Sequence, residues 1–322
     1  MFGCGHRPFP SHDARSCELR WQRDRPTERG LVALRERYNL AAVIDPSRSD
    51  YDNLRKLTAW VNARWDHDGS GTPTRSDPLT ILREAEAGES FACFAFAIAL
   101  AGVAEAVGMP SRVVYLAGDN ADDPAVIARQ GFGHVVTEVW LADRSRWAVA
   151  DAQLGYTFTR ASEPIGVIEL IAALDARRSS TVHIDRAVRA VSDRERADYV
   201  AFLAMFVAYA SAYEDQRRFV DDTGKPRMRN LLSFRGSANL PKRFVEKPTQ
   251  LTTDVACFNT PPHPQPKVIL ASLRQKTGNT QLSETCPKRR LRTLRPMSAR
   301  TPDDASGRRT YSTLSPEISE WR

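Results

Sequence analysis

An apolar stretch that contains one cysteine constrains the fold of this chain more than any other segment. GESFACFAFAIALAGVAEAVGMPSRVV, residues 88–114, is built mainly from small and apolar side chains, and its one cysteine is Cys93. Ser90 is a candidate N-cap, which places Cys93 in the first turn of a helix running to about Val107. Gly108 then ends that helix. Because the helix is rich in Ala and Gly, it can pack tightly in a core and hold the thiol still.

Three strand-like segments follow this predicted helix. RVVYLAG (112–118), HVVTEVWL (134–141) and RWAVAD (146–151) are rich in β-branched and aromatic residues. The short polar turn between the last two predicts a β-hairpin. If paired residue numbers sum to 285, His134 and Asp151 face each other directly, and at 287 they are diagonal neighbours on one face. An even sum would place them on opposite faces.

The rest of the chain divides by composition. A helix is predicted between residues 49 and 65, and two more near 166–176 and 194–214. The apolar run 199–213 is 15 residues long, short of the roughly 18 that a membrane span needs, so we expect a buried helix there. The predicted organisation is a loose leader (1–29), a catalytic domain (30–160), a helical extension (161–230), an incomplete accessory β region (231–270) and a basic disordered tail (271–322).

The charge and the cysteines argue against several classes of protein. The net charge is +7, but residues 271–322 hold 11 Lys and Arg against 5 Asp and Glu, so the tail carries +6 of it. We therefore expect no specific nucleic-acid partner. The five cysteines are scattered without a CxxC pair, which predicts neither a zinc site nor a disulfide framework, and no cofactor is expected. No apolar signal segment opens the sequence, so a cytoplasmic location is expected.

Cys93, His134 and Asp151 form the candidate catalytic set. Taken singly, each has a plain structural explanation: a cysteine in an apolar helix packs, a histidine at a strand end is exposed, and an aspartate ends a strand. The amino end of a helix favours a thiolate, however, and a histidine following a glycine-rich loop can serve as its base. A carboxylate then orients the imidazole and stabilises the imidazolium.

The segment from about Leu54 to Gly155 resembles the transglutaminase-like superfamily, which has a papain-like cysteine-catalysis fold. The matching pieces are GESFACFAFAIALAGVAEAVGMPSRVV, GHVVTEVWL and RWAVADAQLG, with Cys93, Gly108, Arg112, His134, Trp140, Trp147 and Asp151 in the family's order. Ala92 and Phe94 flank the cysteine where many members carry Gly or Trp nearby. The resemblance implies an α+β fold in which the catalytic helix packs on an antiparallel sheet.

The resemblance also implies an activity. Cys93 would attack an amide or ester carbonyl and form an acyl-thioester, which water or an amine resolves. We expect protease-like or amide hydrolysis of a protein, peptide or small-amide substrate, with transamidation as the second possibility. A catalytically silent scaffold on the same fold is the alternative. A metal hydrolase built on His67, Asp68 and His134 is disfavoured, because no HxxxH or CxxC spacing occurs.

Two further residues are candidates for the site. The backbone N–H of Cys93 would serve as one oxyanion donor, and the indole N–H of Trp65 is a candidate for the second, although a structural aromatic fits Trp65 equally well. Arg112 could bind a substrate carboxylate, but a role in ordering the strand beside the helix is favoured.

Overall fold

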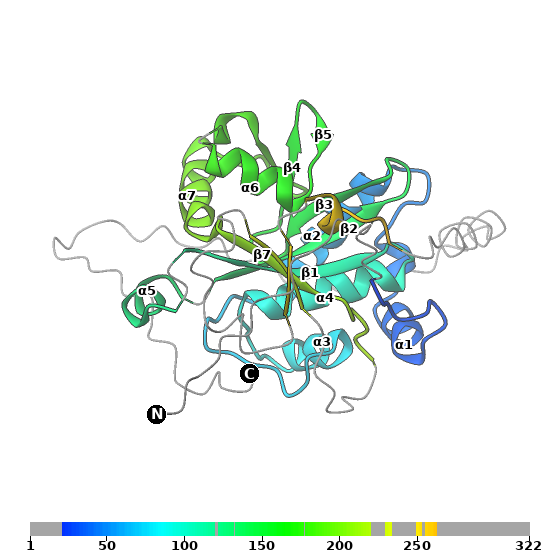
Figure 1. Cartoon of the computed structure of the whole chain (residues 1–322). Helices are drawn as coiled ribbons and strands as arrows, with labels where there is room; N and C mark the ends of the chain where they lie inside the picture. The colour runs from blue at the N-terminus through cyan, green and yellow to red at the C-terminus, as the bar shows by residue number, and fades with distance from the viewer. Residues whose placement is uncertain are drawn as a thin grey trace.

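A sheet of nine strands with helices on both faces forms the described part of the molecule (Figure 1). The computed structural model describes residues 21–119, 122–131, 133–176, 178–219, 229–233, 249–252 and 255–262. Its helices are α1 (Arg29–Arg37), α2 (Asp50–Asn62), α3 (Pro78–Glu86), α4 (Cys93–Ala106), α5 (Pro124–Gln130), α6 (Val167–Asp175), α7 (Asp193–Leu203) and α9 (Val255–Phe258).

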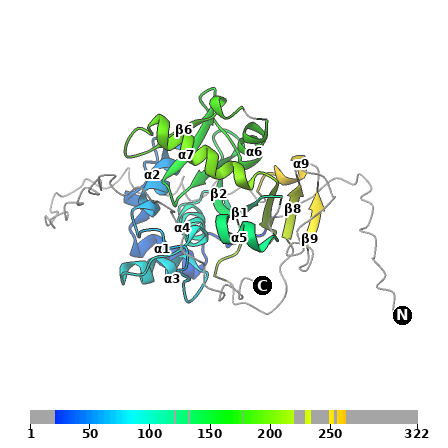
Figure 2. The same cartoon turned by 90° about the vertical axis from the view of Figure 1, so that its left-hand side faces the viewer.

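The strands run antiparallel to their neighbours, except for the parallel pair β8 and β9. Their order is β5-β4-β3-β2-β1-β7-β8-β9, with β6 paired to β4. Figure 2 shows β8 and β9 at one edge, with α9 nearby. The strands are β1 (Ser111–Ala117), β2 (His134–Leu141), β3 (Arg146–Asp151), β4 (Tyr156–Arg160), β5 (Glu163–Pro164), β6 (His183–Arg186), β7 (Tyr209–Tyr213), β8 (Arg229–Ser233) and β9 (Thr249–Thr252). The α+β fold with an antiparallel sheet is therefore confirmed.

The hairpin formed by β2 and β3 adopts the diagonal register. Trp140 pairs with Trp147 and Thr137 with Ala150, so paired numbers sum to 287. Side chains alternate between the faces of a strand, which places His134 beside Val136 and Asp151 beside Val149. Those valines belong to the core that also contains the apolar residues of α6 and α7.

Helix α4 is largely buried, with 11 of its 14 residues enclosed between α1–α3 and the sheet. Gly102 permits a close contact with α3, because a Cβ there would lie 2.3 Å from Cγ of Pro78. The helix begins at Cys93 with Ala92 as its N-cap, so the predicted cap at Ser90 is wrong. Ala92 has no side-chain acceptor, and the N–H groups of the first turn are therefore left for other partners.

The segment after Asp151 differs from the prediction. Strands continue through β4, β5 and β6, and the helix expected over 194–214 ends at Leu203, with β7 following at Tyr209–Tyr213. A continuous apolar run suits a buried strand as well as a buried helix, so its periodicity could not separate the two. The predicted helix near 166–176 is confirmed as α6. Among the described residues, none of the helices has both the length and the hydropathy of a membrane span. The predicted tail (271–322) and most of 231–270 lie outside the described residues.

The end of the predicted leader is packed into the domain. Trp21 is buried, and the backbone of Gln22 exchanges hydrogen bonds with Glu214 and Gln216. One aromatic residue in a polar segment gives no periodic signal, so the sequence did not predict this contact. Residues 1–20 lie outside the described part.

The same segment brings Arg23 to Glu105, near the end of α4, with Nη1 and Oε2 3.2 Å apart. Burial raises the pKa of Glu105 to about 7, against the opposing effects of the Arg23 charge and of a hydrogen bond from the Ser111 N–H. The folded protein therefore binds the carboxyl proton of Glu105 more tightly than the unfolded chain does. The contribution of Glu105 to the free energy of unfolding is present below about pH 4.5 and is lost as the pH rises through about 7.

The free energy of unfolding of Glu105→Gln, relative to that of the wild type, is accordingly expected to rise by about 2–3 kcal/mol as the pH goes from 5 to 8. Glutamine never ionises but can still accept the hydrogen bond from Ser111. Urea denaturation at both pH values measures the difference, with the exposed Glu86→Gln as the control. A difference that is the same at pH 5 and pH 8 would contradict the assignment.

Candidate active site

His134 and Asp151 meet at the end of the sheet. His134 is the first residue of β2 and Asp151 the last of β3, and the hairpin register places both on the face covered by α7. The His134 Nε2 atom lies 2.7 Å from Oδ2 of Asp151. Both side chains are buried. The two residues that the sequence singled out on this hairpin are therefore in direct contact.

The glycine before His134 fixes where β2 begins. Gly133 has φ 146°, and a Cβ there would lie 2.2 Å from the carbonyl oxygen of Leu116. Leu116 pairs with His134 across β1 and β2. Only glycine permits this close approach, so Gly133 positions the histidine as well as providing loop freedom.

Cys93 reaches the same imidazole from the start of α4. It is a free, half-buried thiol, and its interaction with His134 helps to raise the pKa of that imidazole. Because Asp151 occupies Nε2, Nδ1 is the ring nitrogen left for the thiol. The structure thus brings Cys93, His134 and Asp151 together in the order that the sequence predicted.

The electrostatic surroundings favour a protonated His134. Burial by itself lowers the pKa of His134, but the charge of Asp151, the hydrogen bond that the ring donates to this carboxylate and the interactions with Cys93 together raise it to about 10. An imidazolium is therefore the form expected beside the Cys93 sulfur at neutral pH.

Helix α7 supplies two residues that the sequence analysis missed. The Tyr199 hydroxyl donates to Oδ2 of Asp151 at 3.0 Å, and the Phe202 ring lies edge-on to the His134 ring at 5.1 Å. Burial raises the pKa of Tyr199 well above its usual value, so the hydroxyl stays protonated and remains a donor. The only signal in the sequence was the spacing of three between two aromatic residues of a predicted helix, which any core helix shares.

Trp65 lies against α4. Its ring stacks on Phe96 of α4 with centroids 4.2 Å apart and meets Phe91 edge-on. Phe96 follows Cys93 by three residues and so lies on the same side of α4. Within the described part of the chain, the buried Nε1 of Trp65 has no hydrogen-bond partner. An unsatisfied buried donor is costly.

Arg112 fits the ordering role rather than contact with substrate. Its guanidinium is fully buried, and Nε and Nη2 donate to Oε2 of Glu138 at 2.8 and 2.6 Å. The Nη1 atom donates to the carbonyl oxygen of Phe258 at 2.6 Å. The rings of Trp21, Trp147 and Phe258 surround the cation at 4.2–4.6 Å.

The two other residues of the disfavoured metal hypothesis lie in the loop after α2. The pKa of His67 is lowered by desolvation and then by the charge of His134, which places this histidine near the site. The Asp68 carboxylate instead accepts hydrogen bonds from the backbone and hydroxyl of Ser70. The described residues contain no group of three His, Cys, Asp or Glu side chains that could hold a metal ion.

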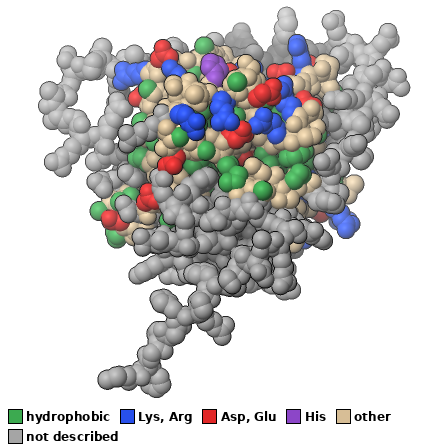
Figure 3. All heavy atoms as spheres, turned by 45° about the horizontal axis from the view of Figure 1, so that its top comes forward, with side chains coloured by type: hydrophobic (Ala, Val, Ile, Leu, Met, Phe, Trp, Pro, Cys, Tyr) green, Lys and Arg blue, Asp and Glu red, His purple; other side chains and the backbone are tan. Residues whose placement is uncertain are grey.

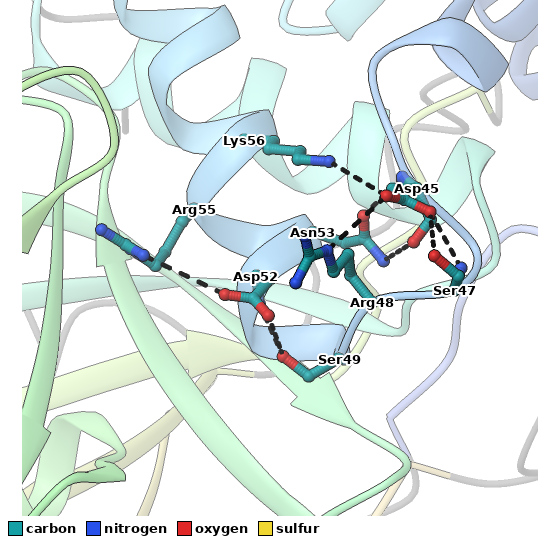
Figure 4. A network of polar contacts seen from close by, with 8 residues as sticks. All are labelled: Asp45, Ser47, Arg48, Ser49, Asp52, Asn53, Arg55 and Lys56. Carbon is teal, nitrogen blue, oxygen red and sulfur yellow. Dashed lines mark hydrogen bonds and ion pairs between the residues drawn. The ribbon is translucent and has the colours of Figure 1, made fainter.

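A separate shallow depression of about 300 Å³ is lined by Asp45, Arg48, Asp52, Arg55, Lys56 and Ala187. Its cations lie 3.8–4.0 Å from carboxylates of the same segment (Figure 4). On the face drawn in Figure 3, basic and acidic side chains are likewise interspersed. Exposed pairs of this kind contribute little energy, and the mixed charges favour no single ligand.

A family model matches part of the chain. Residues 38–152 match the model of the transglutaminase-like superfamily, the family that the motifs of this segment resemble. No curated protein matches the sequence. One solved structure, described as a "Putative Cysteine Protease" from Cytophaga hutchinsonii, is 14% identical with a TM-score of 0.29. The match covers 48% of this chain and 46% of that protein, about half of its length.

Proposed function

We propose that the protein is a cysteine-dependent acyl-transfer enzyme that hydrolyses an amide, with Cys93 as nucleophile, His134 as acid and base, and Asp151 as the group that orients His134. The observation that carries the proposal is one buried imidazole that lies 2.7 Å from the Asp151 carboxylate and whose pKa is also raised by the Cys93 thiol. A nucleophile, a base and an orienting carboxylate in contact are the elements of nucleophilic acyl transfer.

The proposed reaction has two halves. The Cys93 thiolate attacks the carbonyl carbon and forms a C–S bond, and the His134 imidazolium gives its proton to the leaving amine as the C–N bond breaks. Water then attacks the acyl-thioester, loses a proton to His134, and the C–S bond breaks to restore the thiolate. In transamidation an amine takes the place of this water. The cycle requires a reduced thiol, which the cytoplasm would maintain.

The oxyanion that forms during each attack needs hydrogen-bond donors. Cys93 is the first residue of α4, so its backbone N–H is among those that a helix cannot satisfy internally. The proposed second donor is the unpartnered indole N–H of Trp65, whose ring stacks on Phe96 of the same helix. Arg112 takes no part in this scheme.

Alkylation of Cys93 by iodoacetamide, followed from pH 5 to pH 9 by peptide mass spectrometry, tests the proposal. Rapid labelling at pH 6 is expected in the wild type, because the imidazolium favours the thiolate, and labelling at this pH is expected to fall at least about tenfold in His134→Gln. His183→Gln, which replaces an exposed histidine, is the control.

The outcomes separate the enzyme from its alternative. A wild-type rate at pH 6 that His134→Gln leaves unchanged would make Cys93 a packing residue and favour the catalytically silent scaffold. If the thiol is activated, trapping of acyl-Cys93 from amide donors, with water or a lysine-like amine as acceptor, distinguishes hydrolysis from transamidation.

A further inference from the structure

We propose that α7 is part of the active site and that Tyr199 is a positioning residue, whose hydroxyl holds Oδ2 of Asp151 and limits how strongly this oxygen binds the His134 imidazolium. The inference rests on the proposed function, because it assigns a role within the same Cys–His–Asp arrangement. It goes further by adding an element that lies outside the transglutaminase-like domain at residues 38–152.

One face of α7 covers both members of the hairpin pair. Tyr199 and Phe202 are three residues apart and therefore lie on the same side of the helix. Tyr199 contacts the carboxylate of Asp151 and Phe202 contacts the ring of His134. In Figure 1, α7 lies on the opposite side of the sheet from α3 and α4. His134 thus interacts with residues of both α4 and α7.

The bonds to Asp151 give Tyr199 a chemical role. The carboxylate accepts from Leu154 N–H at Oδ1, while His134 and Tyr199 share Oδ2. A hydrogen bond donated to the shared oxygen withdraws electron density from it. The Asp151 carboxylate therefore binds the imidazolium proton less strongly with the Tyr199 hydroxyl in place than it would without it. A general acid must release its proton to the leaving group, so an imidazolium held too strongly is a poor acid.

The packing of Tyr199 permits the hydroxyl to be removed without removing the ring. Tyr199 is buried, stacks on Phe158 at 5.7 Å and meets Tyr156 edge-on at 5.1 Å. Phenylalanine at position 199 keeps both ring contacts and loses only the donor. Tyr156 is the matched control, because it belongs to the same aromatic cluster but its hydroxyl is not the one that binds Oδ2.

The titratable groups that face the His134–Asp151 pair come from four elements: Cys93 of α4, His67 of the loop after α2, Tyr156 of β4 and Tyr199 of α7. Tyr199→Phe leaves the first three in place. A change in the titration of His134 in this variant is therefore attributable to the lost hydroxyl.

The test follows the ¹⁵N shifts of the His134 ring against pH in the full-length wild type, Tyr199→Phe and Tyr156→Phe. Tyr199→Phe is expected to raise the pH at which His134 loses its proton by about half a unit or more, and Tyr156→Phe to leave it unchanged. Incorporation of 3-fluorotyrosine at position 199 makes the hydroxyl a stronger donor, and is expected to shift the midpoint the opposite way. The 3-fluorotyrosine variant tests the same inference even if Tyr199→Phe does not fold.

A midpoint that stays at the wild-type value, moves downward in Tyr199→Phe, or moves equally in Tyr156→Phe overturns the inference. The proposed function fails separately, when His134→Gln leaves the alkylation of Cys93 unchanged. The ring titration is independent of that result, since it reports the Tyr199 contact whether or not Cys93 is a nucleophile.

Discussion

Asp151→Asn is expected to lower the pKa of His134 from about 10 to below its ordinary value of 6.5. Burial, the largest single influence on this imidazole, disfavours its charged form, and the Asp151 carboxylate supplies the main opposing effect. With a neutral amide in its place, only the interactions with Cys93 still oppose desolvation. ¹⁵N shifts of the His134 ring measure the change directly, without any substrate.

The same substitution has a consequence for stability. In the wild type the folded pKa of His134 lies above the unfolded value, so the pair's contribution to the free energy of unfolding is fully present below about pH 6.5 and is lost as the pH rises through about 10. Wild-type stability should thus fall more steeply than that of Asp151→Asn between pH 7 and pH 10. Asp68→Asn removes a charge from the exposed loop and serves as the control. Parallel pH profiles for wild type and Asp151→Asn would refute the ion pair.

Arg112→Met is expected to lower the free energy of unfolding by about 3–5 kcal/mol, because it leaves the Glu138 carboxylate buried without its cation. Glu138 also accepts a hydrogen bond from the Val167 N–H at 2.7 Å, so Glu138→Gln retains an acceptor there. The double variant Arg112→Met/Glu138→Gln should recover part of the loss, since neither remaining side chain carries a charge. Urea denaturation of the four proteins gives the coupling energy.

The exposed pair Arg144–Glu163, with its atoms 2.8 Å apart, is the natural comparison. Arg144→Met should change stability by less than about 1 kcal/mol, because water solvates the carboxylate that is left behind. If Arg112→Met behaved like Arg144→Met, the buried cation would contribute nothing beyond an ordinary surface pair.

The elements that were predictable from the sequence are those with a local signal. The bounds of β2 and β3 follow from β-branched alternation around a short polar turn. The position of His134 and Asp151 on one face then follows from a register in which paired residue numbers have an odd sum. The apolar segment 199–213 shows the limit of this reasoning. Its residues are divided between α7, a short 3-10 helix and β7, and the division depends on β7 pairing with β1 and β8, which no local pattern encodes.

The candidate site divides in the same way. Cys93, His134 and Asp151 could be predicted to lie together because their residue types, chain order and spacing match a candidate nucleophile, base and orienting carboxylate. Tyr199 could not, because its role depends on which face of α7 meets the sheet. Ser90 illustrates a smaller error: serine is a good N-cap, but α4 begins two residues after the point at which Ser90 would cap it, with Ala92 in that position.

The surroundings of Arg112 also constrain when the protein can finish folding during synthesis. Trp21 and Phe258, which both contact this guanidinium, are separated by most of the chain. At the usual translation rate of about 5–20 residues per second, Arg112 and Glu138 are synthesised many seconds before Phe258 emerges from the ribosome. During that interval the cation lacks one of its three aromatic neighbours and its carbonyl partner. A nascent chain that ends before Phe258 therefore carries the complete Cys–His–Asp set on a core that is still open at Arg112.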